Sequence, residues 1–352
     1  MSDARPPEPQ QPPPERPKTG IGGMQAFEEL GQRIAGTESI SVVVATVVVI
    51  VVIGIFHPDF VEKANLLSIL QQSVYIGLLA AGMSFLLAMR EIDLSVGSNF
   101  GLSLIIAALL MQHGWNPWVA GGAAVVAGGL FGLVNAICVH VFRIPTIVAT
   151  LATLSMGRGL ALALTNGQQV VNLPAGSSFF TRLGGNTFGL ATSVWVFLAV
   201  VVLLTVLLRM TPFGYRVRSI GSNPEAAAFS GISISRVRVQ ALVLIGLLAG
   251  LGGALGLAFF ISGDPNIGTG FELQAIAAAV IGGTPLRGGS GTALGAAVGA
   301  VLLSVVSSGL VFFNVPLNWT SFATGAVILA AVSLDSLVRH RRGPTRGPGL
   351  GA

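Results

Sequence analysis

The sequence has little charge and a single cysteine, and each shortage excludes a class of protein. Charged residues make up 9% of the 352 residues, whereas a soluble globular domain carries roughly 25%. Cys138 lies in an apolar run and can form no disulfide within the chain. Soluble globular domains and disulfide-stabilised secreted domains are therefore excluded, and the 52% apolar content is typical of a membrane protein.

The motifs of common catalytic and nucleotide-binding sites are also lacking. The four histidines are scattered, and neither an HExxH helix, a GxSxG turn nor a GxxxxGKS or GxxxxGKT loop occurs. The chain is therefore not expected to be an enzyme, to hydrolyse ATP, or to bind a metal or cofactor. Its net charge of +5 comes from arginines between and beyond apolar segments rather than from one basic stripe, so nucleic acid is not an expected partner.

Apolar segments dominate what is present. About 20 apolar residues cross the roughly 30 Å hydrocarbon core of a bilayer, and windows of that length predict an all-α polytopic membrane protein with about ten transmembrane helices. The segments 71–89 and 272–284 are short and interrupted by glycine, so we expect half-helices sheltered by their neighbours. The predicted spans are 40–56, 71–89, 95–112, 118–141, 145–165, 193–209, 238–261, 272–284, 291–312 and 318–336.

Three regions are predicted along the chain. Residues 1–24 are rich in proline, glycine and charge, form a disordered tail, and lack the pattern of a removable signal peptide. Residues 25–338 form the transmembrane domain, which includes a polar loop at 210–237. Residues 339–352 form a basic tail.

The distribution of positive charge predicts the orientation of these spans. With ten spans and both termini in the cytoplasm, all of the 19 Lys and Arg residues except Lys63, Arg158 and Arg182 lie on the cytoplasmic side. This arrangement satisfies the positive-inside rule. Removing one span from the first half would place the loop 210–237 and the basic tail outside, so an even number of spans is favoured.

The loop 210–237 contains the pattern of a complete short helix. Asn223 can cap it, Pro224 stands at the first helical position, and Glu225 lies in the first turn, where the helix dipole favours an anion. Gly231 provides the stop. Because a helix of about two turns is marginal alone in water, we expect tertiary support or a docked cytoplasmic partner.

A second polar segment, MREIDLSVGS, places Arg90, Glu91 and Asp93 between the second and third predicted spans. Asp93 or Ser95 can simply cap the third span. Alternatively, a deeper Asp93 marks a solute or proton path and needs a partner, for which Arg90 is the expected candidate. Both interpretations stand at the level of sequence.

The third polar segment, SGDPNIGTGFEL, joins two spans on the predicted external side. A solvated hairpin is one interpretation, and a role in receiving a solute or an external partner is the other. Polar uncharged solutes need hydroxyl and amide contacts, which this segment offers. The candidate residues for a solute path or gate in the two segments are Asp93, Ser95, Asn99, Asn266, Thr269, Glu272 and Gln274.

Three ordered motifs together resemble a known family. They are IDLSVGS at 92–98, GSNPEAAAFSGI at 221–232 and GTGFELQAIAAAVIGGTPLRGGSGT at 268–292. Over residues 60 to 336 the chain resembles the ribose-type permeases of bacterial ABC sugar importers. In that family the cytoplasmic Glu-Ala-Ala helix fits a cleft on the ATPase subunit, which implies a coupling role for Gly221, Asn223, Glu225, Ala226, Ala227 and Gly231.

The resemblance implies a multi-pass subunit of the bacterial inner membrane in an assembly of two permease copies, two ATPase subunits and an external sugar-binding protein. ATP would bind only to the ATPase subunits, and the permease would contact membrane lipid. The transported solute would be a monosaccharide, either a pentose, a hexose or a related polyol. Branched-chain amino acid permeases share the general pattern but lack the IDLSVG segment, so sugars are favoured.

One departure and one alternative accompany this resemblance. Arg90 and Glu91 stand where many relatives have two glycines, which affects the conformation expected before Asp93. The alternative function is an ion-coupled secondary transporter of a small polar solute. Such a carrier usually buries an acidic group in the middle of a span, whereas nearly all acidic residues here lie near predicted span ends.

Overall fold

The computed structural model describes residues 37–316 and six single positions between 319 and 333. The predicted tails at 1–24 and 339–352 lie outside the described residues. The predicted span 318–336 also lies outside them, apart from those six positions. The described part is almost entirely helical, in agreement with the predicted class of fold.

Short connections join the helices, and two short strands, β1 (Asn186–Thr187) and β2 (Leu190–Ala191), form an antiparallel hairpin between α7 and α8. Both turn residues, Phe188 and Gly189, have positive φ angles, as a tight two-residue hairpin requires. The helices are α2 (Thr37–Phe56), η1 (Pro58–Val61), α3 (Lys63–Ala88), α4 (Val96–Gln112), α5 (Pro117–His140), α6 (Thr146–Thr165), α7 (Ser178–Leu183), α8 (Thr192–Met210), α9 (Pro212–Ser222), α10 (Pro224–Phe229), α11 (Ile234–Phe260), α12 (Phe271–Ile281) and α13 (Ala293–Phe312).

Every predicted span before residue 316 coincides with a helix. Among the described residues, six helices are long and apolar enough to cross a membrane: α3, α5, α6, α8, α11 and α13. Three further apolar stretches, Ile40–Phe56, Val96–Gln112 and Phe271–Ile281, are shorter. The multi-pass membrane character is therefore clear, while the number of about ten spans stays a prediction.

The expectation of half-helices is wrong for one segment and agrees with the structure of the other. α3 is continuous over 26 residues. Polar residues such as Gln71 and Gln72 shorten the apolar stretch seen in the sequence, but they are good helix formers and do not interrupt the helix. Its glycines also lie in close packing, since a Cβ at Gly82 would come within contact of Leu248 and Ile245. By contrast, α12 has 11 residues, and a length of roughly 16 Å is too short to cross a bilayer.

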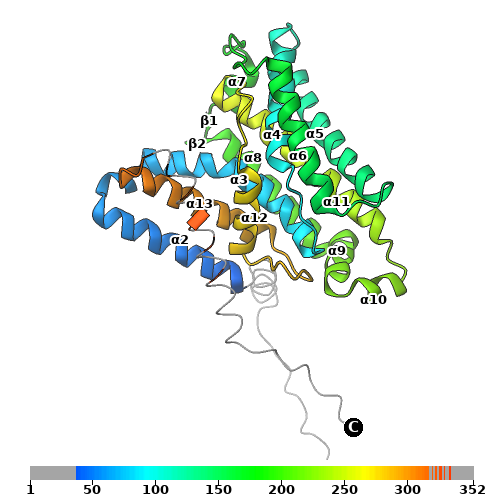
Figure 1. The fold of residues 1–352 in the computed structure, drawn as a ribbon. Coiled ribbons are helices and arrows are strands. Elements are labelled where there is room, and N and C mark those ends of the chain that lie inside the picture. The colour runs from blue at the N-terminus through cyan, green and yellow to red at the C-terminus, as the bar shows by residue number, and fades with distance from the viewer. Residues whose placement is uncertain are drawn as a thin grey trace, which may run out of the picture.

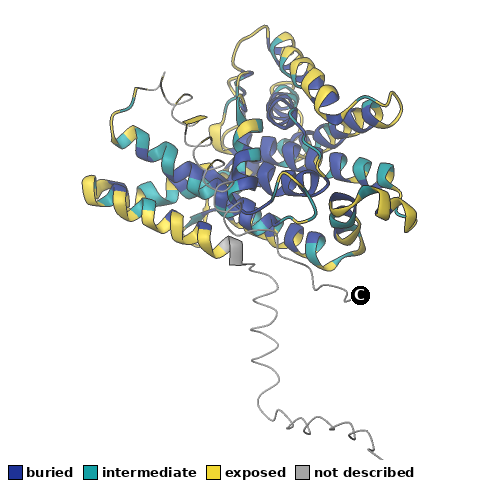
Figure 2. Ribbon diagram, turned by 60° about the horizontal axis from the view of Figure 1, so that its bottom comes forward, coloured by how far each residue is buried: buried dark blue, intermediate teal, exposed yellow. Residues whose placement is uncertain are grey.

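Helices α3 and α11 form the centre of the molecule, and α6 is the most exposed of the long helices. α11 lies directly against α5 because glycines remove the side chains between them. A Cβ at Gly246 would meet the carbonyl oxygen of Gly128, and a Cβ at Gly250 would meet that of Ala124. This close backbone approach is the small-residue packing of membrane helices. Figure 2 shows the buried centre and the largely exposed α2.

The two ends of the molecule carry different short elements. α7 and the β1–β2 hairpin lie at one end, and α9 and α10 lie at the opposite end (Figure 1). α8 joins the hairpin directly to α9, so the helix runs from one end to the other. We refer to them as the hairpin end and the α9–α10 end.

Candidate functional site

The predicted short helix is present as α10. The side chain of Asn223 accepts a hydrogen bond from the backbone N–H of Ala226 at 3.0 Å, and Pro224 occupies the first turn. Gly231 has a φ of 80°, the left-handed conformation that ends the helix. The local structure thus agrees with the sequence, while the coupling role of these residues stays a prediction.

A second helix, α9, precedes α10 and was not predicted within the polar loop. Thr211 caps α9 by accepting a hydrogen bond from the N–H of Gly214, and Pro212 stands in its first turn. The sequence signal was available, because Thr211–Pro212 repeats the cap-and-proline pattern of Asn223–Pro224. The loop 210–237 is therefore a pair of capped helices rather than one helix in an irregular segment.

The pair presents a mixed surface at its end of the molecule. Phe229, the last residue of α10, is 94% exposed, and Tyr215 on α9 is 63% exposed. Glu225 and Ala226 are exposed beside them. A groove of about 550 Å³ separates the two helices; its lining residues include Tyr215, Ser219, Asn223, Ala226 and Ile232. Phe229 and Tyr215 thus place two aromatic side chains on the exposed surface of the α9–α10 end.

Two of the residues predicted for coupling are buried. Ala227 is 4% exposed and packs toward the molecule, and Gly221 is buried. A Cβ at Gly221 would collide with the carbonyl oxygen of Ala88 at the end of α3 and would lie 2.5 Å from the amide nitrogen of Gly289. Gly289 in turn donates its N–H to the Ala88 carbonyl at 2.9 Å. Gly221 therefore lets α9 pack directly against the end of α3, while its role in coupling stays a prediction.

The expected pairing of Arg90 with Asp93 is wrong. Arg90 donates from Nε to the carbonyl of Gly221 at 2.7 Å and from Nη2 to that of Ser222 at 3.0 Å. Its φ is 66°, a conformation that glycine adopts without strain. The sequence missed this contact because the partners are backbone carbonyls more than 130 residues away.

Asp93 lies instead in a buried polar network. Its Oδ1 accepts the backbone N–H of Ser95 at 2.7 Å and the Ser95 hydroxyl at 2.6 Å. Asn135 on α5 donates to the Ser95 hydroxyl at 2.8 Å, and Thr153 on α6 donates to Asn135 at 2.6 Å. All four residues are at most 3% exposed. The network joins the connection 89–95 to α5 and α6 through hydrogen bonds between side chains.

The simple capping interpretation of this segment is also wrong in detail. Ser95 is the N-cap residue of α4 but makes no side-chain cap bond, and Asp93 bonds Ser95 itself rather than an N–H of the first helical turn. Asn99 extends the polar group by donating to the carbonyl of Gly128 on α5 at 3.1 Å and accepting from Ser103 at 3.2 Å. Asp93, Ser95 and Asn99 are thus held together at the start of α4.

The residues predicted around 264–274 form a second group. Arg158 on α6 donates to the carbonyls of Ile267 at 2.9 Å and Pro265 at 3.3 Å, so a span residue holds this connection. Thr269 donates to the carbonyl of Asn266 at 2.6 Å, and both residues are exposed. This group was predicted as a unit, but its arginine was not, because Arg158 lies far away in sequence.

Glu272 brings the second group next to the first. Its Oε2 is buried without a hydrogen-bond partner among the described residues, and a Cβ at Gly97 would meet that oxygen and the carbonyl of Gly268. Gly97 lies in the first turn of α4, two residues after Ser95. Gln274 is half-buried in the next turn of α12. The absence of a side chain at Gly97 therefore allows the two polar groups to approach one another.

Comparison with known proteins shows the family. The model described as "Branched-chain amino acid transport system / permease component" matches residues 65–332. The L-arabinose ABC transporter permease protein of Azospirillum brasilense is 34% identical over 303 residues, which cover 86% of this chain and 88% of that protein. The ribose import permease protein of Bacillus subtilis is 35% identical over 288 residues, 82% of this chain and 89% of that protein.

A third relative, the autoinducer 2 import system permease protein of Salmonella typhi, is 34% identical over 308 residues, which cover 87% of this chain and 88% of that protein. No solved structure gives a significant match. The family match includes α9, α10 and the buried network. Membership implies a separate ATPase and a solute-binding protein as partners, and permease subunits of this kind are generally non-catalytic. The chain therefore belongs to the branched-chain amino acid and ribose permease family of ABC importers, as a multi-pass protein of the inner membrane.

Proposed function

We propose that this chain carries a monosaccharide, a pentose, hexose or related polyol, across the inner membrane as one of two identical permease subunits. ATP is bound and hydrolysed by the separate ATPase, which docks on the α9–α10 end. The chain itself binds no cofactor. It crosses the membrane ten times with both termini in the cytoplasm, and lipid covers its exposed apolar helices, including α2.

The observation that carries the proposal is the exposed surface of α10. Phe229 is 94% exposed, whereas Ala227 on the same short helix is 4% exposed. The inner face of α10 is thus anchored, and its outer face offers an aromatic side chain next to Glu225. Burying one aromatic side chain contributes about 2 kcal/mol to an interface, and aromatic residues are common at the centres of protein interfaces.

The orientation is supported by charge and by connectivity. The predicted cytoplasmic set includes Arg90, Arg216, Arg218, Arg236 and Arg238, all in or beside the α9–α10 end. A cytoplasmic ATPase can reach that end only if it faces inward. The hairpin end then faces outward, where Phe188 at the hairpin turn offers an exposed contact for the sugar-binding protein.

Transport then follows from movement of α10. Closure of the ATPase subunits on ATP displaces α10, and the helices attached to α9 and α10 rock as rigid bodies. The buried network around Asp93 lies between α4, α5 and α6, where such a movement changes helix contacts. Hydroxyl and amide groups, including those of Asn266, Thr269 and Gln274, can bond a polar uncharged solute along the path.

The choice of a sugar rests on the relatives and on one motif. Two of the relatives are named for L-arabinose and ribose import, and a third for autoinducer 2 import. The segment 92–98 that favours sugars over branched-chain amino acids is folded into the buried network. Uptake of labelled ribose, arabinose, galactose and leucine by cells that express the chain with its own binding protein tests the substrate class. Uptake of leucine alone would contradict the proposal.

The docking of the ATPase is tested by purifying the tagged chain from its own membranes in mild detergent. Phe229→Asp should lower recovery of an ABC ATPase by about 30-fold, for a loss of about 2 kcal/mol. Glu225→Arg should also lower it, because the change reverses the charge at the N-terminus of α10. Phe188→Asp is the matched control, because Phe188 is also 94% exposed but lies at the hairpin end. Equal ATPase recovery with Phe229→Asp and wild type would refute docking at α10.

A further inference from the structure

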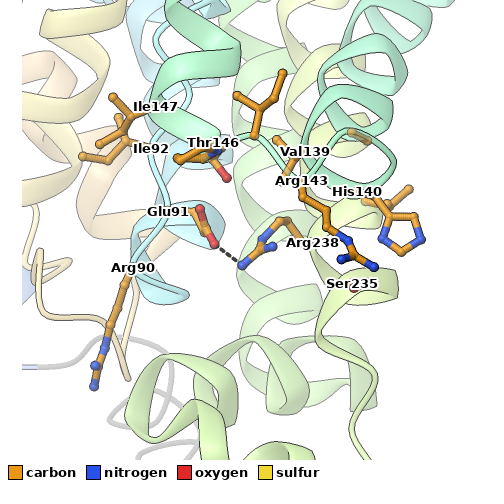
Figure 3. Close-up of a pocket in the computed structure, with 14 residues that line it drawn as sticks. Arg90, Glu91, Ile92, Val139, His140, Arg143, Thr146, Ile147, Ser235 and Arg238 are labelled. Atoms are coloured by element: carbon orange, nitrogen blue, oxygen red, sulfur yellow. Dashed lines mark ion pairs between the residues drawn. The ribbon is translucent and has the colours of Figure 1, made fainter.

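Two successive charged residues, Arg90 and Glu91, point in different directions from the start of the connection 89–95. Arg90 bonds the carbonyls of Gly221 and Ser222 at the end of α9. Glu91 forms an ion pair with Arg238 in the second turn of α11. Figure 3 shows the Arg90 side chain directed away from the Glu91–Arg238 pair.

These contacts bracket α10 in the sequence. Gly221 and Ser222 directly precede the cap of α10, and Arg238 follows α10 after one short turn and the start of α11. Both ends of the segment that carries α10 are therefore attached to the same two residues. We call Arg90, Glu91 and Arg238 the clasp.

The bonds of Arg90 are of a strong kind. The last carbonyls of a helix have no partner within the helix, and a cation near a helix C-terminus is favoured by the helix dipole. Arg90 satisfies two such carbonyls of α9 with its planar guanidinium group. The left-handed backbone of Arg90 is costly for a residue with a Cβ, so the side-chain contacts offset a conformation that glycine would adopt freely.

The clasp is separated from the buried network by one residue. Ile92 lies between Glu91 and Asp93, and one extended residue spans at most about 3.5 Å. Asp93 is 2% exposed and is bonded twice to Ser95 at the start of α4. Because this link is so short, a displacement of the clasp by more than a few ångströms must also move Asp93.

A cavity beside the clasp provides room for that displacement. It has a volume of about 640 Å³ and lies between the connection 89–95, the turn between α5 and α6, and the start of α11 (Figure 3). Glu91 and Arg238 both line it. Nε of Arg238 is buried with no hydrogen-bond partner among the described residues, so this end of the pair is not locked by further bonds.

We propose that the clasp transmits the movement of α10 to the buried polar network at Asp93. Arg90 and Glu91 act as positioning residues that couple ATP hydrolysis to solute movement. The proposal rests on the proposed function of α10 as the docking helix for the ATPase. The proposal thus gives a role to Arg90 and Glu91, the two charged residues that directly precede the segment 92–98.

The test measures solute transported per ATP hydrolysed in proteoliposomes that contain the permease, its ATPase and its binding protein. Arg90→Gly removes both carbonyl contacts and also relieves the left-handed backbone. Because these two effects oppose one another, the variant should insert and melt close to the wild-type temperature. Arg90→Gly and Arg238→Gln should lower the transport-to-ATP ratio by about fivefold or more, the lower range of coupling between sites. Arg236→Gln is the matched control, because Arg236 lies two residues before Arg238 on α11 and is exposed.

A charge exchange separates the ion pair from general disturbance. Glu91→Arg combined with Arg238→Glu should regain most of the ratio that Glu91→Arg alone loses. A wild-type ratio in both Arg90→Gly and Arg238→Gln would overturn the proposal, as would failure of Arg90→Gly to insert, because the contact would then serve folding. Absence of the ATPase from purified wild type would instead refute the proposed function of α10.

Discussion

Each end of the molecule presents a phenylalanine that is 94% exposed, but the supports of the two residues differ. Phe188 stands on a hairpin whose side-chain bonds are local: Trp195 donates to the carbonyl of Thr187 at 2.9 Å, and the hydroxyls of Thr187 and Thr192 lie 2.8 Å apart. Phe229 stands on a helix whose segment is bonded to Arg90, more than 130 residues earlier in the chain.

The comparison distinguishes an end that can bind a partner from an end that can also pass a movement on to other helices. A partner can bind to the hairpin. The side-chain hydrogen bonds of the hairpin are local, however, so a movement of the hairpin is not passed by them to distant helices. A contact on α10 reaches α3 through Gly221, the connection 89–95 through Arg90, and α11 through Arg238. The α9–α10 end is therefore suited to coupling, and the hairpin end to recognition.

The largest expected difference between the ends concerns glycines. Gly221→Ala should destabilise the protein by about 2 to 3 kcal/mol. The new Cβ would meet backbone atoms of Ala88 and Gly289, and backbone atoms cannot move aside as a flexible side chain can. Gly189→Ala should cost about 1 kcal/mol, since only its positive φ opposes a side chain and nothing lies within 4 Å. Melting temperatures in detergent check both values. Equal shifts would contradict the view that Gly221 is packed more tightly against its neighbours than the hairpin turn is.

A smaller difference is expected along α6. Thr153→Val should destabilise by about 1 to 2 kcal/mol, because the buried Oδ1 of Asn135 loses its 2.6 Å hydrogen bond. Thr165→Val, near the hairpin end of the same helix, should cost about 0.5 kcal/mol or less, because its hydroxyl bonds only carbonyls of α6. Thermal melting of the two variants side by side distinguishes a network contact from a local one. If Thr165→Val were the more damaging change, the network would not be a stabilising link.

The smallest expected effect tests the independence of the hairpin. Trp195→Phe removes the bond to the Thr187 carbonyl and should loosen the hairpin by about 1 kcal/mol, which raises amide hydrogen exchange at 186–191 by roughly fivefold. Recovery of the ATPase and the overall melting temperature should stay at wild-type values. A fall in ATPase recovery would show that the hairpin end communicates with α10.

Much of the helical layout could be predicted from sequence, because apolar length and capping patterns are local properties. The ends of most spans, the cap of α10 at Asn223 and the stop at Gly231 agree with the structure. The continuous α3 and the additional α9 were missed for local reasons as well. An average of hydropathy hides polar residues at the start of a helix, and the cap at Thr211 was not recognised.

The sites were less predictable, because their residues meet across distant segments. Asp93, Ser95 and Asn99 were candidates from one motif, but Asn135 and Thr153 were not, since a lone polar residue in an apolar span does not reveal its partner. Arg90 was expected to neutralise Asp93 and instead binds backbone carbonyls, which no side-chain pattern can indicate. The burial of Gly221 likewise depends on a neighbouring helix end.

The sequence by itself determined the membrane class, most helix boundaries, the capped α10 and the family resemblance, since these depend on composition and on residues close together in the chain. The tertiary structure alone decided which residues of the coupling motif face outward, which partner each charge takes, and how the connection 89–95 joins α9 to the buried network. Packing between helices sets those outcomes, because burial and hydrogen-bond partners are properties of neighbours in space.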